Sequence, residues 1–199
     1  MLEILIATNN SGKIKEIKDI LNNPKIKILD MKDFPSHPKI VEDGKTYQEN
    51  AFKKARIISE YTGKICMADD SGLEIEYLKG KPGIYSARWG KSDDERISKV
   101  LTLLEKVPPK ERKAKFVCAA TLVFPNGKVF EVKEECKGSI DFKPKGEHGF
   151  GYDPIFLVPE YGKTFAELGE KVKNQISHRG KAMRKMVNII NELIVQQRI

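Results

Sequence analysis

The first part of the chain alternates between short apolar runs and amphipathic stretches. Residues 2–7 form an apolar run of strand length that ends in polar residues, a pattern typical of a buried strand leading into a turn. Between residues 14 and 21, apolar side chains recur at helical spacing, and this pattern stops at Asn22-Asn23-Pro24. A strand, a polar turn and a helix in this order predict the start of an α/β fold.

The same alternation continues toward the middle of the chain. Residues 25–30 form a candidate second strand, and Thr46 with Glu49 makes a capping box for a helix that runs to Tyr61. The short apolar run 65–68 predicts a buried strand that ends at Asp69-Asp70-Ser71-Gly72. Because functional groups of open α/β sheets gather at the carboxyl ends of strands, this string is a candidate site.

The second half of the chain adds a hairpin and further helices. The pattern predicts a helix over 93–104, and strands over 114–124 and 128–136 flank the turn residues Pro125-Asn126-Gly127. Residues 137–152 hold four glycines and predict a long irregular loop, which in a compact domain is usually functional or mobile. Ser177 is expected to cap a final helix whose apolar residues face the core.

These elements predict an α/β fold with a mixed, twisted sheet flanked by helices. At 199 residues the chain has the length of one domain, and we expect residues 1–199 to form a single domain of two lobes with a central substrate cleft. No run approaches the roughly 18 apolar residues of a membrane span, so no membrane partner is expected.

The charge of the chain favours an acidic partner. Thirty-six basic residues exceed 28 acidic ones, giving a formal charge of +8, which fits nucleic acid, an anionic membrane surface or a polyphosphate. Most lysines stand among glutamates on predicted helix faces, where a solvated surface is the simpler interpretation. The three cysteines lack C-x-x-C spacing and the start of the chain lacks a secretion signal, so we expect reduced thiols and a cytoplasmic location.

The string Thr8-Asn9-Asn10-Ser11-Gly12-Lys13 lies where the first strand meets the first helix. Free N–H groups and the positive end of the helix dipole attract phosphate at such a place, and Lys13 adds a charge. An ordinary polar turn that caps the helix explains the same residues equally well. The spacing differs from that of a P-loop.

Asp69 and Asp70 are adjacent carboxylates after a buried strand, an arrangement that is costly unless a cation or a proton separates them. In a strand they point to opposite sides, so we expect only one to bind a metal directly. Magnesium prefers one or two carboxylates, and Glu42 is a plausible second ligand. The alternative is an Asp-Ser-Gly turn with surface acids.

Two further strings contain residues suited to a nucleobase. Phe150-Gly151-Tyr152-Asp153 offers an aromatic ring for stacking and a carboxylate acceptor, although it also fits an aromatic core anchor with a glycine turn. His178 and Arg179 lie in the first turn of a predicted helix, where positive charge is unfavourable unless an anion or a carbonyl is near. A lone histidine there is more often structural.

Taken together and in order, these strings resemble the inosine triphosphate pyrophosphatase family, and the similarity covers nearly the whole chain. The strings that carry it are Thr8-Asn9-Asn10 with Lys13, Glu42-Asp43-Gly44, Ala68 to Leu73, Pro82 to Arg88, Gly149 to Pro154, and Lys173 through Arg179.

The resemblance implies hydrolysis of ITP, dITP or XTP to the monophosphate and pyrophosphate, with Mg²⁺ or Mn²⁺ as cofactor. It implies a homodimer and no stable nucleic-acid partner. It places metal binding on Glu42 and Asp70, with Asp70 also the proton acceptor, although Asp69 remains a candidate for that role. Substrate contacts are expected from Thr8, Asn9, Asn10, Ser11, Gly12, Lys13, Ser71, Phe150, Gly151, Tyr152, Asp153, Lys173, His178 and Arg179.

Two other functions compete with this interpretation. A pyrophosphatase of similar architecture that acts on pyrimidine or modified nucleotides would keep the metal-binding acids and change the base pocket. A basic nucleic-acid-binding protein would bind polynucleotide with a steep salt dependence and would not need Asp70.

Overall fold

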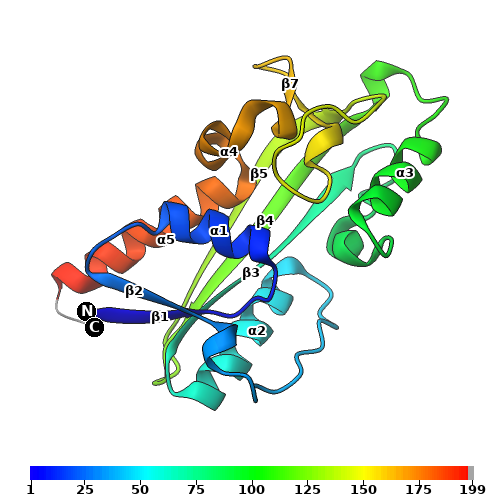
Figure 1. Ribbon diagram of the computed structural model, residues 1–199. Helices are drawn as coiled ribbons and strands as arrows, with labels where there is room; N and C mark the ends of the chain where they lie inside the picture. The colour runs from blue at the N-terminus through cyan, green and yellow to red at the C-terminus, as the bar shows by residue number, and fades with distance from the viewer. Residues whose placement is uncertain (197–199) are drawn as a thin grey trace. The chain divides into compact units, whose positions relative to one another are not determined.

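Seven strands form one mixed sheet in the order β2-β1-β3-β4-β5-β6-β7. Figure 1 shows the computed structural model, which describes residues 1–196. The strands are β1 (Leu2–Ile6), β2 (Ile26–Asp30), β3 (Ile65–Ile75), β4 (Lys113–Val123), β5 (Val129–Ile140), β6 (Phe156–Val158) and β7 (Lys163–Thr164). The helices are α1 (Ser11–Ile20), α2 (Tyr47–Thr62), α3 (Asp93–Leu103), α4 (Phe165–Ile176) and α5 (His178–Val195), with 3-10 turns at Met31–Asp33, Gly83–Arg88, Pro109–Glu111 and Asp153–Ile155.

The sheet mixes parallel and antiparallel pairs. Strand β1 pairs in parallel with both β2 and β3, so that Ile4 lies beside Ile28 and Ile65. The pairs β5–β6 and β6–β7 are antiparallel. The α/β class and the mixed sheet flanked by helices are therefore confirmed, whereas the single domain over 1–199 and the central cleft stay predictions.

The chain divides into two compact units. Unit 1 comprises residues 1–70, 118–134 and 179–196, and unit 2 comprises residues 71–117 and 135–178. Each unit is thus assembled from segments that are distant in sequence.

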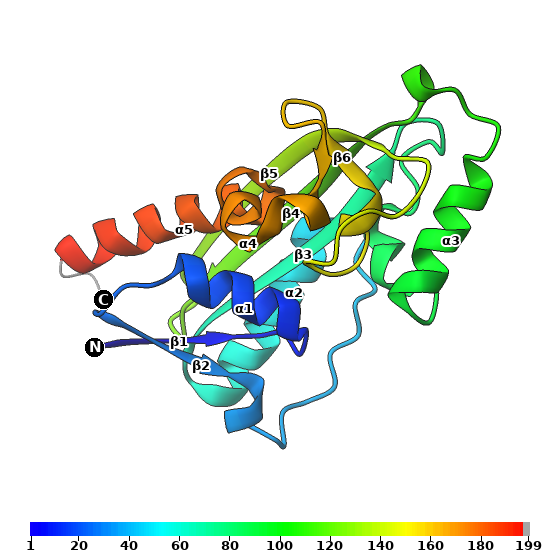
Figure 2. The ribbon, with the colours of Figure 1, turned by 45° about the horizontal axis from the view of Figure 1, so that its top comes forward.

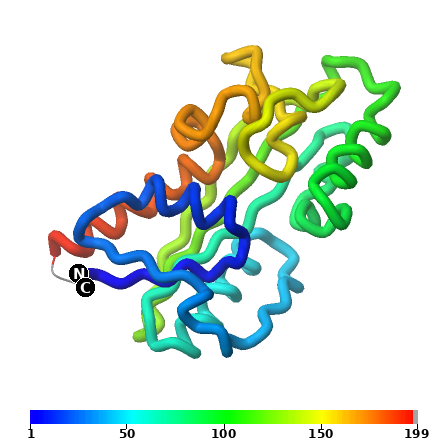
Figure 3. Tube along the Cα trace, viewed as in Figure 1, coloured from blue at the N-terminus to red at the C-terminus, as the bar shows by residue number. Residues whose placement is uncertain are grey.

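Unit 1 has helices on both faces of its part of the sheet (Figure 2). Ile4 and Ile6 of β1 pack in one buried cluster with Ile17 of α1 and Met186 of α5. The intervening Leu5 faces the other way, in a second cluster with residues of α2. This alternation follows from the two-residue period of a strand, which sends successive side chains to opposite faces. Figure 3 shows α1 and α5, far apart in sequence, side by side.

Unit 2 has one core of its own. Leu73 and Ile75 of β3 pack there with Ile97 and Val100 of α3 and with residues from β4, β5, β6 and α4. Phe116 and Phe156 form its aromatic centre, with ring centroids 4.7 Å apart.

Several predicted boundaries require correction. The strand predicted to end at residue 68 continues to Ile75, so Asp69 and Asp70 lie inside β3. The strand predicted over 128–136 continues to Ile140, and the irregular segment before Tyr152 is correspondingly shorter. The extension of β3 follows from Leu73 and Ile75, which are buried beyond the Ser71-Gly72 pair that resembles a turn.

Other predicted elements are confirmed. The Thr46 side chain caps α2 by accepting from the Glu49 N–H at 3.1 Å. A turn joins β4 to β5, with the Gly127 N–H donating to the Phe124 carbonyl at 2.9 Å. Within residues 1–196, no helix is both long and apolar enough to cross a membrane.

Candidate active site

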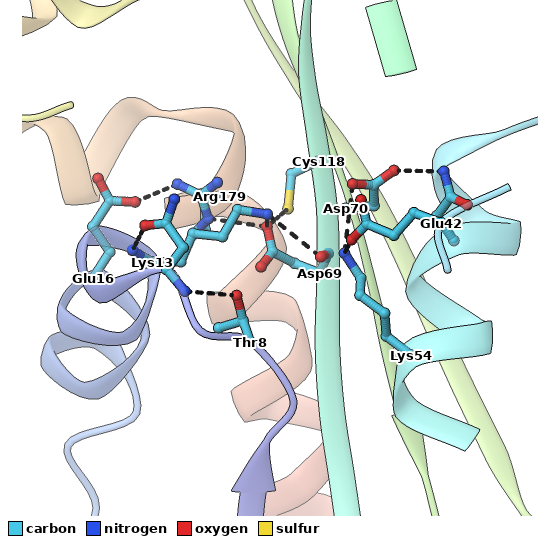
Figure 4. A network of polar contacts seen from close by, with 11 residues as sticks. Thr8, Lys13, Glu16, Glu42, Lys54, Asp69, Asp70, Cys118 and Arg179 are labelled. Atoms are coloured by element: carbon cyan, nitrogen blue, oxygen red, sulfur yellow. Dashed lines mark hydrogen bonds and ion pairs between the residues drawn. The ribbon is translucent and has the colours of Figure 1, made fainter. Parts of the chain in front are cut away.

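The alternation of side chains along β3 separates its two acids, as predicted. Asp69 shares a face of the strand with Met67, whose cluster contains α1 and α5. Asp70 shares the opposite face with Ala68, whose cluster contains α2. Figure 4 shows the consequence, because the two carboxylates turn away from each other and contact different partners.

Asp69 is fully buried and surrounded by donors from unit 1. Its Oδ2 lies 2.9 Å from the Lys13 Nζ and accepts from the Arg179 Nε at 3.2 Å and from the Cys118 Sγ at 3.9 Å. Burial alone would raise the pKa of the Asp69 carboxyl, but the charges of Lys13 and Arg179 outweigh it, so the pKa lies well below its usual range. Asp69 is therefore an ionised group whose charge is matched inside the protein.

Arg179 connects this carboxylate to α1. Its Nη1 donates to Glu16, and only 3% of its side chain is exposed. Burial would lower the pKa of the guanidinium, but Asp69 and Glu16 raise it above its usual value. Glu16 lies one turn after Lys13 on the same helix, so α1 supplies both a cation and an anion to this network.

Asp70 has a different environment. Its Oδ2 accepts from the Asn50 Nδ2 at 3.1 Å, and the Oδ1 of Asn50 accepts from the Gly44 N–H at 2.8 Å. A Cβ at Gly44 would lie 2.7 Å from that oxygen, so a glycine is required for this close approach. Burial raises the pKa of the Asp70 carboxyl, and the charge of Lys54 offsets only part of the rise.

Glu42 and Asp70 share one cation. The Lys54 Nζ lies 2.6 Å from the Glu42 Oε1 and 3.6 Å from the Asp70 Oδ1. Burial would lower the pKa of Lys54, but the nearby carboxylates raise it, so the ammonium stays charged. The two predicted metal ligands thus share the Lys54 ammonium as a common partner.

This arrangement fits a hard divalent cation with an incomplete set of protein ligands. Within the part of the chain that the structure describes, no three His, Cys, Asp or Glu side chains gather into a closed metal site. Magnesium commonly uses one or two carboxylates and takes its other ligands from water and substrate phosphate. The pair Glu42 and Asp70 meets that requirement.

The N-terminus of α1 combines a side-chain cap with exposed polar residues. The Asn10 side chain accepts from the Lys13 N–H at 3.0 Å, and the Thr8 Oγ1 accepts from the Asn10 N–H at 3.2 Å. Asn10 therefore is a helix cap, the alternative that the sequence left open. Asn9 and Ser11 are exposed, and Gly12 is half-buried in the first turn.

The string from Phe150 to Asp153 forms a tight turn in unit 2. The Asp153 Oδ2 accepts from the Phe150 N–H at 2.8 Å. Gly149 precedes it with φ 84°, and a Cβ there would lie 2.1 Å from the same carboxylate oxygen. Tyr152 is buried in the core of unit 2, and Phe150 is half-buried.

Lys173 of α4 approaches this turn from within unit 2. Its ammonium forms a buried ion pair with Asp153 and lies 4.6 Å from the centroid of the Phe150 ring. The fold therefore brings Lys173 to Phe150 and Asp153, which the sequence placed in a different string.

His178 and Ser71 complete the predicted residues of unit 2. His178 is buried and stacks on Phe116 with a centroid distance of 4.6 Å and an interplanar angle of 7°. It begins α5, as predicted, and Arg179 follows it in unit 1. Ser71 lies in β3 immediately after Asp70 and is half-buried.

Sequence reasoning missed four residues of the unit 1 network: Asn50, Lys54, Glu16 and Cys118. The first two carried a usable signal, because they lie four residues apart on α2 beside the apolar stripe of Ala51 and Ala55. A polar residue on a buried helix face requires a partner, and such positions are candidates for a site. Cys118 gave no comparable signal.

This α/β protein combines three features. They are a buried acid matched by lysine and arginine, a pair of carboxylates that share the Lys54 ammonium, and an exposed helix N-terminus. Such features suit an anionic ligand together with a cation. The family model described as the Ham1 family matches residues 4–189, and the chain belongs to that family.

Curated relatives and solved structures agree with this assignment. A dITP/XTP pyrophosphatase of Desulforamulus reducens is 45% identical over 201 residues, and the match covers 100% of both chains. One of the same name from Geobacter sulfurreducens is 46% identical and covers 92% of this chain and 94% of its own. The structure of a HAM1 protein from Coxiella burnetii has a TM-score of 0.88 at 42% identity, covering 96% of this chain and 100% of that one.

Proposed function

We propose that this protein hydrolyses non-standard purine nucleoside triphosphates, namely ITP, dITP and XTP, to the monophosphate and pyrophosphate. The family assignment supports the proposal, as do full-length relatives named dITP/XTP pyrophosphatase. Removal of such nucleotides cleanses the nucleotide pool.

The observation that carries the proposal is the difference between the environments of Asp69 and Asp70, the two acids of β3. The Asp69 Oδ2 already accepts from Lys13, Arg179 and Cys118, and its side chain is fully buried. Asp70 faces the other way, beside Glu42 and Lys54, with 10% of its side chain exposed. Asp70 is therefore the carboxylate available to the reaction, and Asp69 is the one that holds Lys13 and Arg179.

Glu42 and Asp70 would hold the metal, which we propose to be Mg²⁺, with Mn²⁺ as a substitute. Such an ion, when bound, offsets phosphate charge and lowers the pKa of bound water. Asn50 fixes the orientation of Asp70 by its hydrogen bond, and Lys54 holds Glu42 close to it. Asp70 is also our candidate for the proton acceptor.

The triphosphate contacts are assigned to the start of α1. Thr8, Asn9, Asn10, Ser11 and Gly12 offer hydroxyls, amides and backbone N–H groups at the positive end of the helix dipole. Lys13 adds a charge that Asp69 already orients at 2.9 Å. Attack at the α-phosphorus releases pyrophosphate, whose negative charge Lys13 would stabilise.

The base contacts are assigned to Phe150, Asp153, His178 and Arg179, with Gly151 and Tyr152 assisting, whereas Ser71 and Lys173 are assigned to the triphosphate. We assign the Arg179 guanidinium a base contact in addition to its ion pairs with Asp69 and Glu16. Donors aimed at a 6-oxo group would face the amino group of adenine instead. A buried unpaired donor costs about 1–3 kcal/mol, which favours inosine and xanthine over adenine.

The direct test is a panel of ITP, dITP, XTP, ATP, GTP and CTP with magnesium, in which pyrophosphate and orthophosphate are measured separately. We expect pyrophosphate from ITP, dITP and XTP, with much slower release from the other three. Orthophosphate as the product would contradict the assigned cleavage site. Preferential turnover of CTP would instead favour the alternative pyrophosphatase of pyrimidine or modified nucleotides.

A basic nucleic-acid-binding protein remains the alternative of another class, favoured by the charge of +8. It predicts polynucleotide binding with a steep salt dependence that survives Asp70→Asn. We propose instead that the protein has no stable nucleic-acid partner, acts in the cytoplasm and forms a homodimer. Light scattering coupled to gel filtration tests the last point.

A further inference from the structure

The string Pro82 to Arg88 belongs to the family resemblance, yet the proposed function gives it no role. In unit 2 it forms the 3-10 turn Gly83–Arg88, and α3 follows a few residues later at Asp93. Both segments contact the turn that contains Phe150 and Asp153.

Two hydrogen bonds hold the Phe150–Asp153 turn in place. The Asp93 Oδ2 accepts from the Gly151 N–H at 2.7 Å, and the Tyr152 hydroxyl donates to the Ser86 carbonyl at 3.0 Å. Their partners lie 58 and 66 residues away in sequence, so neither bond is a local feature of the turn. Two consecutive residues of the turn are thus held from outside it.

The acceptor of the first bond is itself fixed. Arg96 pairs with the other oxygen of Asp93, and its Nη1 donates to the Ala87 carbonyl at 2.7 Å and to the Gly90 carbonyl at 3.2 Å. Asp93 is 42% exposed as a side chain, but its carboxylate has one Arg96 partner and one backbone partner. A hydrogen bond that an N–H donates to an ionised carboxylate is stronger than one donated to a neutral acceptor.

Ser86, whose carbonyl accepts the second of these bonds, is also held by hydrogen bonds of its own. The Ser86 Oγ accepts from the Leu73 N–H at 2.8 Å and donates to the Gly83 carbonyl at 2.6 Å. Leu73 belongs to β3 and is fully buried, so this anchor is part of the core of unit 2.

The position of Phe150 depends on these anchors. Gly151 follows it with φ 64°, a left-handed conformation that a glycine adopts readily but also leaves readily. The hydrogen bond from Gly151 to Asp93 restricts that freedom on one side of Phe150, and the bond from the Phe150 N–H to Asp153 restricts it on the other.

We propose that Asp93 is a positioning residue for base selection, which orders the Phe150–Asp153 turn through the Gly151 N–H. The inference rests on the proposed function, because it assumes that this turn contacts the base. A competing explanation is that Asp93 serves only as an acid in the first turn of α3, where negative charge interacts favourably with the helix dipole.

Asp94 provides the matched control. It is the next residue in the same first turn, carries the same charge and is exposed. Asp93→Ala and Asp94→Ala therefore remove the same interaction with the helix dipole, but only Asp93→Ala removes the acceptor of the Gly151 N–H.

The experiment measures kcat and KM of the full-length protein for ITP and ATP. We expect Asp93→Ala to raise KM for ITP about tenfold, with a smaller effect on kcat, and to lower the ITP-to-ATP ratio of kcat/KM. Asp94→Ala should leave all these values unchanged. Asp93→Asn keeps an acceptor oxygen and should recover most of the ratio. Equal behaviour of the two alanine variants would overturn the proposal.

A second measurement does not depend on turnover. Hydrogen exchange of the Gly151 amide, followed by NMR on labelled protein, should be at least tenfold faster in Asp93→Ala than in Asp94→Ala. Unchanged protection of Gly151 would overturn the proposal even if activity changed. Should Asp93→Ala fail to fold, Asp93→Ser and the matched Asp94→Ser provide the same comparison.

These two measurements distinguish a failure of the proposed function from a failure of the role proposed for Asp93. If the wild-type protein does not hydrolyse ITP, the proposed function fails, whereas the exchange of Gly151 still shows whether Asp93 orders the turn. If the wild-type protein hydrolyses ITP and Asp93→Ala keeps the wild-type ratio, only the role of Asp93 fails.

Discussion

The candidate residues of unit 1 are oriented mainly by other charges, whereas the Phe150–Asp153 turn of unit 2 is oriented to a large extent by backbone hydrogen bonds. In unit 1, Asp69 is held by Lys13 and Arg179. In unit 2, the N–H groups of Phe150 and Gly151 each bind a carboxylate. The difference shows that one protein can orient candidate site residues in two ways, one sensitive to loss of a charge and the other to backbone conformation.

The largest effect is expected from Asp70→Asn. Asp70 is the acid that other charges do not neutralise fully, and an amide would weaken metal binding while keeping an acceptor for Asn50. We expect turnover of ITP to fall about a thousandfold, equivalent to about 4 kcal/mol, with little change in Tm. The measurement is kcat by pyrophosphate release alongside a thermal melt. A variant that kept more than about a tenth of its rate would contradict the metal-site assignment.

Asp69→Asn, in contrast to Asp70→Asn, should mainly lower the stability of the protein. Removing one partner of a buried ion pair leaves uncompensated charge, here on Lys13 and Arg179, so we expect the free energy of unfolding to fall by about 3 kcal/mol. Urea denaturation of this variant and of Asp70→Asn compares the two acids directly. Equal stability of the two variants would mean that the charge network around Asp69 does not hold unit 1 together.

Gly149→Ala tests the region that backbone conformation holds. Gly149 has φ 84°, and a methyl group there would meet the Asp153 carboxylate at 2.1 Å, so the turn has to shift. We expect a loss of about 1–3 kcal/mol in stability and a lower ITP-to-ATP ratio of kcat/KM. Because the cause is steric, added salt should not alter the difference from wild type. A strong salt dependence of that difference would indicate that charge dominates in unit 2 as well.

His178→Ala should have a moderate effect on selectivity. The imidazole is buried and stacked on Phe116, and we assign it a donor role toward a 6-oxo group. Loss of one such donor should reduce the ITP-to-ATP ratio of kcat/KM about tenfold, at the lower end of the range for a buried hydrogen bond. Steady-state kinetics with both nucleotides measures the ratio. An unchanged ratio would show that His178 has no part in base selection.

The smallest effect concerns Glu3 of β1, at the surface of unit 1. Its carboxylate binds Lys27 at 2.9 Å and Lys64 at 2.7 Å, and these contacts lower its pKa from 4.5 to about 2. The pairs therefore stabilise the protein above pH 4.5, and this contribution is lost as the pH falls toward 2. The Tm difference between wild type and Glu3→Gln should shrink over that interval. A difference that stayed constant with pH would rule out the ion pairs as its source.

Much of unit 1 could be predicted from the sequence. The period of two along β3 was enough to place Asp69 and Asp70 on opposite faces, and the apolar spacing of α1 and α5 identified the helices that cover one face. The length of β3 could not be predicted, because Ser71-Gly72 resembles a turn and only the burial of Leu73 and Ile75 shows that the strand continues.

Unit 2 was harder to predict. Helix α4 was missed because Gly169, with φ 75°, interrupts its helical pattern, and β6 and β7 have only three and two residues. The contacts of Asp93 and Lys173 with the Phe150–Asp153 turn join segments that are separated in sequence, and local patterns do not record such pairings. Tertiary structure, and not propensity, decided these elements.

The segmented composition of unit 1 bears on how the protein is made. Its core joins Ile4 and Ile6 of β1 to Met183 and Met186 of α5, so the ribosome has to synthesise nearly the whole chain before these partners meet. At about 5–20 residues per second, that interval is on the order of 10–40 s. During it the apolar face of the first strand lacks its native cover from α5. Strand β1 therefore has to wait for α5 before its core is complete, and a nascent chain stalled before α5 would need protection from aggregation.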